Sequence, residues 1–73
     1  MNTYIATFHT HFGAMSFYKQ ITSQEIYAKL MPVPRTLSSS CGTCCMFKHD
    51  NSDFNGEDLE EIFIVQNDKY IAV

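Results

Sequence analysis

The sequence predicts a small α+β domain in which one main helix packs against a mostly antiparallel sheet. One stretch has apolar residues at helical spacing, and several short segments are rich in β-branched and aromatic residues or alternate with period two. The length of 73 residues allows a single domain spanning residues 1–73, and a hydrophobic fraction of 45% is enough for a core. Because so short a chain buries only about 60% of its unfolded surface, that core would gain from a homodimer, a bound metal or another staple.

The first strand and the helix follow each other closely. Residues 4–9 are rich in β-branched and aromatic side chains and predict a strand. Thr10 is then a good N-cap for a helix over residues 11–22, in which Gly13 is the weak point. The residues expected to face the sheet are Met15, Tyr18 and Ile21.

Two strands flank a polar loop in the middle of the chain. Alternation predicts a strand over residues 25–31, and Pro32 and Pro34 should end it because proline lacks an N–H. Residues 35–43 form a loop of mostly Arg, Thr, Ser and Gly. Residues 44–48 predict the next strand.

The last third of the chain predicts a hairpin. Residues 58–61 have room for a single helical turn, and residues 62–65 form an apolar strand. Asn67 and Asp68 suit a two-residue turn, after which residues 70–73 return as the final strand.

Composition excludes several classes of function. The net charge is −3, with four of the five cations in residues 1–49 and seven of the eight acidic residues after them. Four scattered cations do not make a basic stripe, so we expect no nucleic-acid partner. No apolar run approaches the ~20 residues of a membrane span, so we expect no membrane partner. The N-terminus has no features of a signal peptide, and we expect a cytoplasmic location.

The cluster Cys41-Gly42-Thr43-Cys44-Cys45 is the chemically distinctive feature. In the cytoplasm such a cluster is more often catalytic, redox-active or metal-binding than a structural disulfide. Cys41 and Cys44 have C-x-x-C spacing and are the candidate catalytic thiols. Gly42 permits close approach of a ligand. The candidate ligand-binding residues around the thiols are Arg35, Ser38, Ser39, Ser40 and Gly42. Arg35 is the nearest cation in sequence. The three serines supply hydroxyl groups, and the backbone N–H groups of the loop could form an anion-binding nest.

The run from Lys29 to Gly42, with its pattern PVPR-x-x-S-S-x-CG, resembles the putative selenium/sulfur carrier protein-like family, a group of small bacterial domains. The strand ending in Phe8 and the helix opening at Thr10 and His11 are also similar, so the resemblance covers about residues 3–48. It implies a ferredoxin-like βαββαβ fold. Only residues 57–61 are available for the second helix, so we expect a truncated form, β-α-β-β-(short helix)-β-β.

The resemblance implies Cys41 as the functional thiol, with Arg35, Gly42 and residues 38–40 as its setting. The leading hypothesis is a thiol-based sulfur or selenium carrier or redox module that meets donor and acceptor proteins. Cys44 is either a resolving thiol or the first residue of a strand, and Cys45 is expected in the core. No constellation for a stand-alone enzyme is visible, and no cofactor is expected.

Two other functions remain open. A zinc-type module would use the three cysteines and a histidine, although Cys44 and Cys45 should point to opposite faces of a strand. Because these two side chains diverge, we expect that no residues of this chain are metal ligands. The other alternative is a non-catalytic interaction domain.

Overall fold

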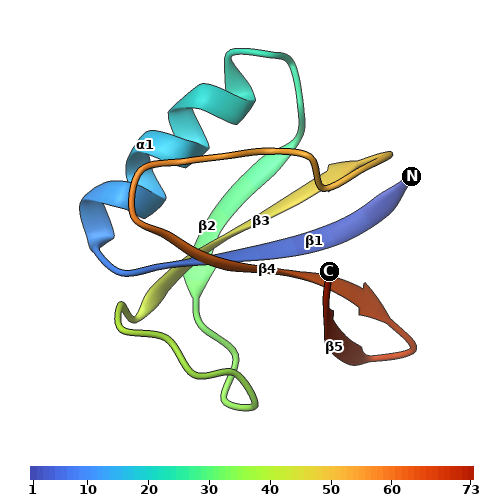
Figure 1. The fold of residues 1–73 in the computed structure, drawn as a ribbon. Helices are drawn as coiled ribbons and strands as arrows, with labels where there is room; N and C mark the ends of the chain where they lie inside the picture. The colour runs from blue at the N-terminus through green and yellow to red at the C-terminus, as the bar shows by residue number, and fades with distance from the viewer.

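The computed structural model describes residues 1–73 and contains one helix and one five-stranded sheet (Figure 1). Neighbouring strands are antiparallel throughout, in the order β2-β3-β1-β4-β5. The predicted α+β class is therefore confirmed. The elements in chain order are β1 (Asn2–Phe8), α1 (His11–Thr22), β2 (Ala28–Pro32), β3 (Thr43–His49), β4 (Leu59–Gln66) and β5 (Lys69–Ala72).

The first three strands form a split β-α-β unit. β3 pairs with both β1 and β2, so β1 and β2 run in the same direction with β3 between them. α1 makes the crossover between these two strands and lies on one face of the sheet (Figure 1). With β4 on the other side of β1, this is the strand order of the ferredoxin-like fold.

Helix α1 begins after its N-cap Thr10 and ends at Thr22, as the sequence predicted. The Thr10 side chain accepts a hydrogen bond from the Gly13 backbone N–H at 3.0 Å, which confirms it as the N-cap. After the helix, Glu25 has a φ of 61°, the left-handed position usually filled by glycine, and β2 starts only at Ala28 rather than at residue 25.

The helix packs on the sheet through Tyr18 and Ile21, as expected, but Met15 does not face the sheet. Ala14, Phe17 and Ile21 are fully buried, and Tyr18 packs beside them, whereas Met15 is 40% exposed. Aromatic and apolar residues lie on several sides of this helix, so spacing alone did not decide which side faces the sheet. The large Phe17 ring occupies the centre of the core, against Phe8 and Phe47.

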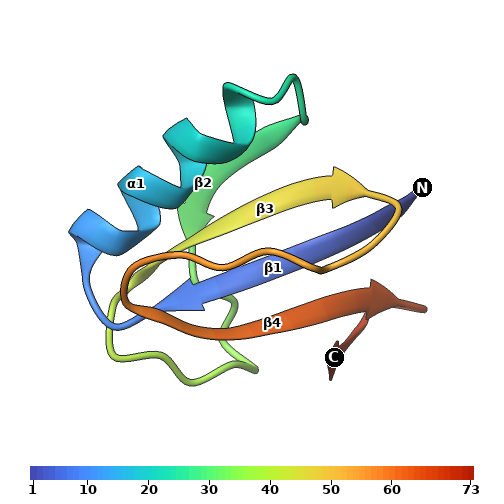
Figure 2. The same cartoon turned by 45° about the horizontal axis from the view of Figure 1, so that its top comes forward.

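The segment between β3 and β4, residues 50–58, takes the place of a second helix. It runs along the same side of the sheet as α1 (Figure 2). Its Phe54 ring packs edge-on against Phe17 and Phe47. A Cβ added at Gly56 would come within 2.9 Å of the Phe17 ring, so glycine allows this close approach. The short helical turn expected at residues 58–61 is wrong, because β4 already begins at Leu59.

A β-bulge at the start of β4 explains that difference. Thr7 pairs with Glu61 but Phe8 pairs with Leu59, so Glu60 is the extra residue on the β4 side. Two consecutive glutamates disfavour a strand on propensity alone. Pairing with β1 overrides that preference, and the bulge turns Glu60 out of the regular alternation.

Strands β4 and β5 form the expected hairpin. Asn67 and Asp68, with φ of 51° and 63°, make the two-residue turn. Tyr70 lies opposite Val65 in the register. β5 then bends away from the plane of the sheet on the side opposite α1 (Figure 1).

The two faces of the sheet bury different side chains. The core between the sheet and α1 includes Phe8, Cys45 and Phe47. The opposite face carries Ile5, Thr7 and Cys44, all of them also buried. No helix has the length and apolar character needed to cross a membrane.

Candidate functional site

The cysteine loop, residues 33–42, joins β2 to β3 and lies on the side of the sheet away from α1 (Figure 1). The Val33 backbone N–H donates to the Gly42 carbonyl at 3.0 Å and closes the base of the loop. The Leu37 N–H donates to the Pro34 carbonyl at 3.0 Å and forms a turn within it. The two prolines thus end β2 and start the loop, as the sequence predicted.

The three cysteines occupy three different environments. Cys41 is in the loop and is 9% exposed, whereas Cys44 and Cys45 are strand residues with no exposed surface. Cys45 lies opposite Ala6 and joins the core on the helix side, as expected. Cys44 lies opposite Thr7 on the other face. All three are free thiols.

Burial sets the protonation of the two strand cysteines. Desolvation raises the pKa of Cys44 to about 11, and the neighbouring Cys41 adds to the rise. Desolvation likewise raises the pKa of Cys45 to about 12, with a further rise from Cys44 and a smaller opposing effect of a hydrogen bond from the Lys29 backbone. The Cys44 Sγ donates weakly to the Pro32 carbonyl oxygen at 3.7 Å. Both groups are therefore thiols at neutral pH.

Glu60, the bulge residue of β4, contacts the loop from the opposite direction. Its Oε1 accepts from the Ser39 hydroxyl at 3.0 Å and from the Ser40 backbone N–H at 3.4 Å, and its Oε2 accepts from the Ser40 hydroxyl at 3.0 Å. The Nδ1 of His9 lies 3.4 Å from the Glu60 Oε2. The serine hydroxyls and N–H that suggested an anion-binding nest thus bind a carboxylate of the chain itself.

These contacts lower the pKa of Glu60. Desolvation by the surrounding chain raises it, but the hydrogen bonds from Ser39 and Ser40 and the adjacent His9 outweigh that effect, so the pKa lies below the usual value of 4.5. Glu60 is consequently a carboxylate at neutral pH. In the sequence Glu60 belongs to the acidic residues that follow residue 49, but the fold places it beside the cysteine loop.

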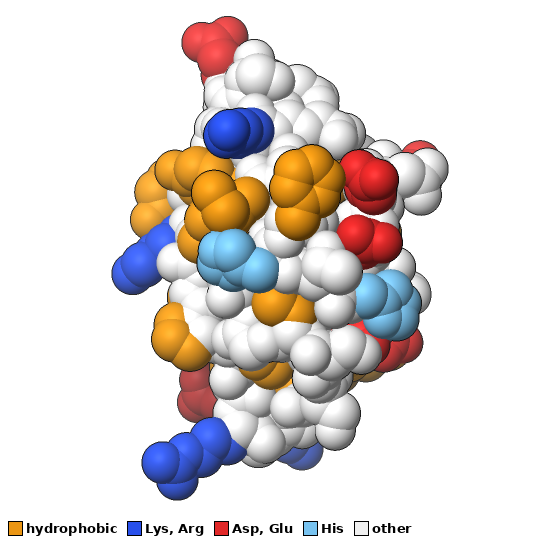
Figure 3. Space-filling model, turned by 90° about the vertical axis from the view of Figure 1, so that its left-hand side faces the viewer, with side chains coloured by type: hydrophobic (Ala, Val, Ile, Leu, Met, Phe, Trp, Pro, Cys, Tyr) orange, Lys and Arg blue, Asp and Glu red, His pale blue; other side chains and the backbone are white.

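Two histidines lie at the two ends of the cysteine segment. His9 reaches the Ser39–Glu60 end, and the Nδ1 of His11, the first residue of α1, lies 3.2 Å from the Thr43 hydroxyl. The space-filling view shows histidine side chains (pale blue) on one face, with mostly uncharged surface between them (Figure 3). The structure therefore brings the β1–α1 junction, the cysteine loop and the β4 bulge to one end of the sheet.

A family model described as putative Se/S carrier protein-like matches residues 3–71. The chain belongs to this family. Neither a curated protein nor a solved structure matches it. The match extends well beyond residue 48, so the Se/S carrier resemblance is confirmed and its expected end was too early. Residues 50–58, without a helix, lie within the matched region.

The remaining candidate residues of the Se/S carrier motif are Arg35, Ser38 and Gly42, and all three are exposed. Arg35 forms no salt bridge. Gly42 has a negative φ, and a Cβ added there would meet nothing within 4 Å. The backbone thus does not require glycine at this position. A side chain at this position would point into open space.

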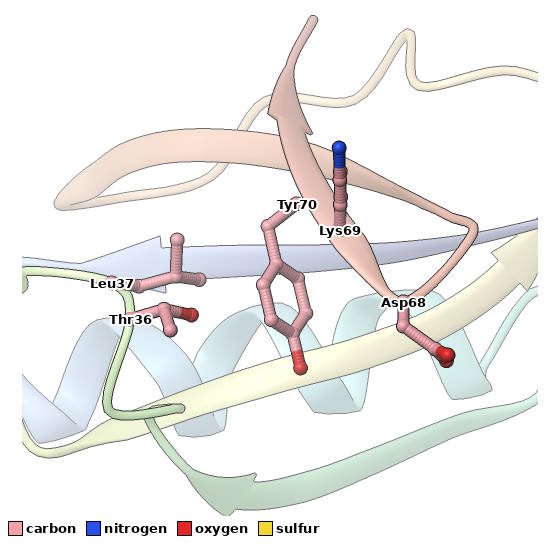
Figure 4. A pocket seen from close by; sticks show the side chains of 5 residues that line it. All are labelled: Thr36, Leu37, Asp68, Lys69 and Tyr70. Atoms are coloured by element: carbon pink, nitrogen blue, oxygen red, sulfur yellow. The ribbon is translucent and has the colours of Figure 1, made fainter.

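A hollow of about 310 Å³ lies between the cysteine loop and the β4–β5 hairpin (Figure 4). Thr36 and Leu37 lie at one side and Asp68, Lys69 and Tyr70 at the other, with α1 behind the sheet. None of the cysteines lines it. The hollow is therefore lined by the loop but not by its cysteine.

The geometry does not favour the zinc-type alternative. No three His, Cys, Asp or Glu side chains are grouped so that they could hold one metal ion. Cys44 and Cys45 point to opposite faces of β3, as their adjacency in a strand predicted.

Glu60 and His9 are the site residues that the sequence did not predict. Their partners are far apart in the chain, and nothing in the run Glu60-Glu61 distinguishes a bulge residue from its neighbour.

Proposed function

We propose that this chain is a carrier that holds sulfur or selenium on the Sγ of Cys41. Membership of the Se/S carrier family supports the kind of cargo. The observation that carries the assignment to Cys41 is its placement, because it is the one cysteine outside a strand and the least buried of the three.

The loading step is a transfer of sulfane sulfur from a persulfide donor. The Cys41 thiolate attacks the terminal sulfur of the donor R–S–SH, a new S–S bond forms, and the donor's own S–S bond breaks. The donor leaves as R–S⁻ and takes up the proton that Cys41 lost. No net oxidation or reduction occurs, and Cys41 becomes Cys41–S–SH. Selenium loading follows the same balance with selenium as the terminal atom.

Unloading returns Cys41 to its thiol by the reverse kind of step. A nucleophile of the acceptor protein attacks the terminal sulfur or selenium atom, and the Cys41 thiolate leaves. This route needs no second cysteine. It makes the chain a carrier between a donor and an acceptor protein rather than a stand-alone enzyme.

Cys44 supplies a second, slower route. Its thiolate would attack the Cys41 Sγ, expel hydrosulfide and leave a Cys41–Cys44 disulfide, which a dithiol reductant would reset. A pKa of about 11 leaves little Cys44 thiolate at neutral pH, so direct transfer is favoured. The second route needs a reductant, which the cytoplasm supplies, and we place the chain there.

Arg35, Gly42 and residues 38–40 form the setting in which the partner approaches. Arg35 and Ser38 are exposed and can contact a partner, while Ser39 and Ser40 fix the loop. Two partners are implied, a donor and an acceptor; a homodimer is compatible with this arrangement.

Intact mass spectrometry tests the proposal. Reduced protein is incubated with a low-molecular-weight persulfide, desalted and weighed, and the adduct is located by peptide mapping. The expected result is a gain of one sulfur atom on Cys41. Cys41→Ser should abolish the gain, whereas Cys44→Ser and Cys45→Ala should retain it. A sulfur adduct that persists in Cys41→Ser at the wild-type level would contradict the assignment.

A further inference from the structure

The cysteine loop has almost no backbone attachment to the rest of the molecule. The Val33–Gly42 bond closes its base, and the one backbone hydrogen bond inside it joins Leu37 to Pro34. No backbone hydrogen bond ties residues 34–41 to the sheet. Such a segment is expected to open easily. Yet Cys41, near its end, is only 9% exposed, so something else holds the loop in place.

Side-chain hydrogen bonds from two serines hold it. The Ser39 hydroxyl lies 3.1 Å from the Phe8 carbonyl oxygen and 3.0 Å from Glu60 Oε1. The Ser40 hydroxyl donates to Glu60 Oε2 at 3.0 Å. Hydrogen bonds to a carboxylate are about twice as strong as those between neutral groups. Most of the attachment therefore depends on one side chain, Glu60.

The chain of contacts leads directly to the thiol residue. The Ser39 Oγ that meets Glu60 also accepts the Cys41 backbone N–H at 3.3 Å. The β-bulge is what aims Glu60 at the loop, since a regular register would return it to the strand's alternation. The geometry thus links the bulge, one serine and Cys41 in series.

We propose that Glu60 is a positioning residue that latches the cysteine loop shut and keeps the Cys41 thiol covered until the latch is released. This inference rests on the proposed carrier role of Cys41, for which the covered thiol is the resting state. The latch is accessible to a partner, because the Glu60 side chain is 24% exposed and its neighbour His9 is 55% exposed. A hydrogen-bond donor of the partner that takes over the carboxylate would free Ser39 and Ser40 and uncover Cys41.

Timed alkylation tests the latch without any sulfur donor. Wild type, Glu60→Gln, Glu60→Ala and the matched control Glu61→Ala are treated with iodoacetamide, and each cysteine is followed by peptide mass spectrometry. Labelling of Cys41 should rise about tenfold in Glu60→Ala, as the loss of charge-assisted hydrogen bonds predicts. Glu60→Gln keeps one acceptor oxygen, so its rate of Cys41 labelling should lie between those of wild type and Glu60→Ala. Glu61→Ala, a change at an exposed side chain, should match wild type.

Cys45 serves as an internal reporter of the whole fold. It is fully buried in the core, so its labelling should stay unchanged in every variant if only the loop opens. Parallel increases at Cys41 and Cys45 in Glu60→Ala would mean general unfolding and would overturn the latch. An unchanged Cys41 rate would overturn it as well.

A double-mutant cycle separates a latch from a merely structural effect. Ser40→Ala should speed Cys41 labelling in the wild-type background but have no further effect beside Glu60→Ala, because the shared bond is already absent. Additive effects would contradict a latch. Failure here leaves the sulfur-loading result on Cys41 unaffected, so the two proposals are tested independently.

Discussion

The Ser39 hydroxyl lies 3.0 Å from a carboxylate oxygen of Glu60, a residue 21 positions further along the chain. This contact joins the cysteine loop to the bulge of β4. It also places the negative charge of Glu60 against Ser39, which is two residues before Cys41. Ser39 and Cys41 lie in the half of the chain that carries most of the cations, whereas Glu60 does not. The electrostatic setting of the loop is therefore decided by tertiary pairing and not by the charges near it in sequence.

Replacing Ser39 should loosen the loop while replacing Ser38 should not. Ser39→Ala removes the hydroxyl that contacts the Phe8 carbonyl, Glu60 and the Cys41 N–H. Alkylation of Cys41 should then rise at least about fivefold, the factor that corresponds to the net loss of a single hydrogen bond. Ser38 is exposed, and Ser38→Ala is the matched control, expected to label at the wild-type rate. Equal rates in the two variants would show that the serine contact does not hold the loop.

The elements set by local physics could be predicted from the sequence. The helix over residues 11–22 and its Thr10 N-cap depend on contacts within one turn, and both are confirmed. The Asn67-Asp68 turn is confirmed for the same reason. Strand alternation likewise placed Cys45 in the core and set Cys44 on the other face.

The features set by strand register and by packing could not be predicted from the sequence. Glu60 became a bulge residue because β1 pairs with β4 on both sides of it, which no local pattern encodes. Met15 was expected to face the sheet, but Ala14 and Phe17 do so, since several sides of the helix are apolar. Residues 50–58 cover the sheet without a helix because Phe54 packs directly on the core rings.

Gly13→Ala should destabilise the fold, although alanine is the better helix former. A Cβ at this position would come within 2.6 Å of the Glu57 carbonyl oxygen and 2.9 Å of the Asp58 Cβ. Overpacking of this kind costs about 1–3 kcal/mol, which exceeds the gain of about 1 kcal/mol in helix propensity. Urea unfolding measures the difference. Gly42→Ala is the matched control and should stay within about 0.5 kcal/mol of wild type, because a Cβ there meets nothing. A stabilised Gly13→Ala protein would show that the 57–58 turn is not packed against α1.

Alkaline pH should destabilise the wild type more steeply than Cys45→Ala. Burial raises the pKa of Cys45 from 9.0 to about 12, so the folded state holds its proton where the unfolded state loses it. The stabilising effect is complete below pH 9 and is lost as the pH rises from there toward 12. The free energy of unfolding should therefore fall by up to about 1.4 kcal/mol per pH unit more in wild type than in the variant.

That comparison uses the slopes of stability against pH, because Cys45→Ala also loses packing at every pH. Urea unfolding between pH 8 and pH 11, with a reductant present and refolding checked at neutral pH, provides the slopes. Tyrosines and lysines titrate in both proteins and cancel. Parallel curves would mean that the Cys45 thiol is not desolvated in the folded state.

The order in which the three thiols react should follow their placement. Cys41 lies in the loop and is the least buried of the three, so it should be alkylated first near neutral pH. Cys44 has a pKa of about 11, so only about one molecule in ten thousand carries its thiolate at pH 7. Cys45, with a pKa of about 12 and a position in the core, should be last. Iodoacetamide labelling over a pH series, read by peptide mass spectrometry, gives all three rates in one sample. Labelling of Cys44 should begin to approach that of Cys41 only as the pH nears 11. Cys44 reacting first at pH 7 would mean that β3 opens before the loop does, and the sulfur-carrying role would then have to be assigned to Cys44.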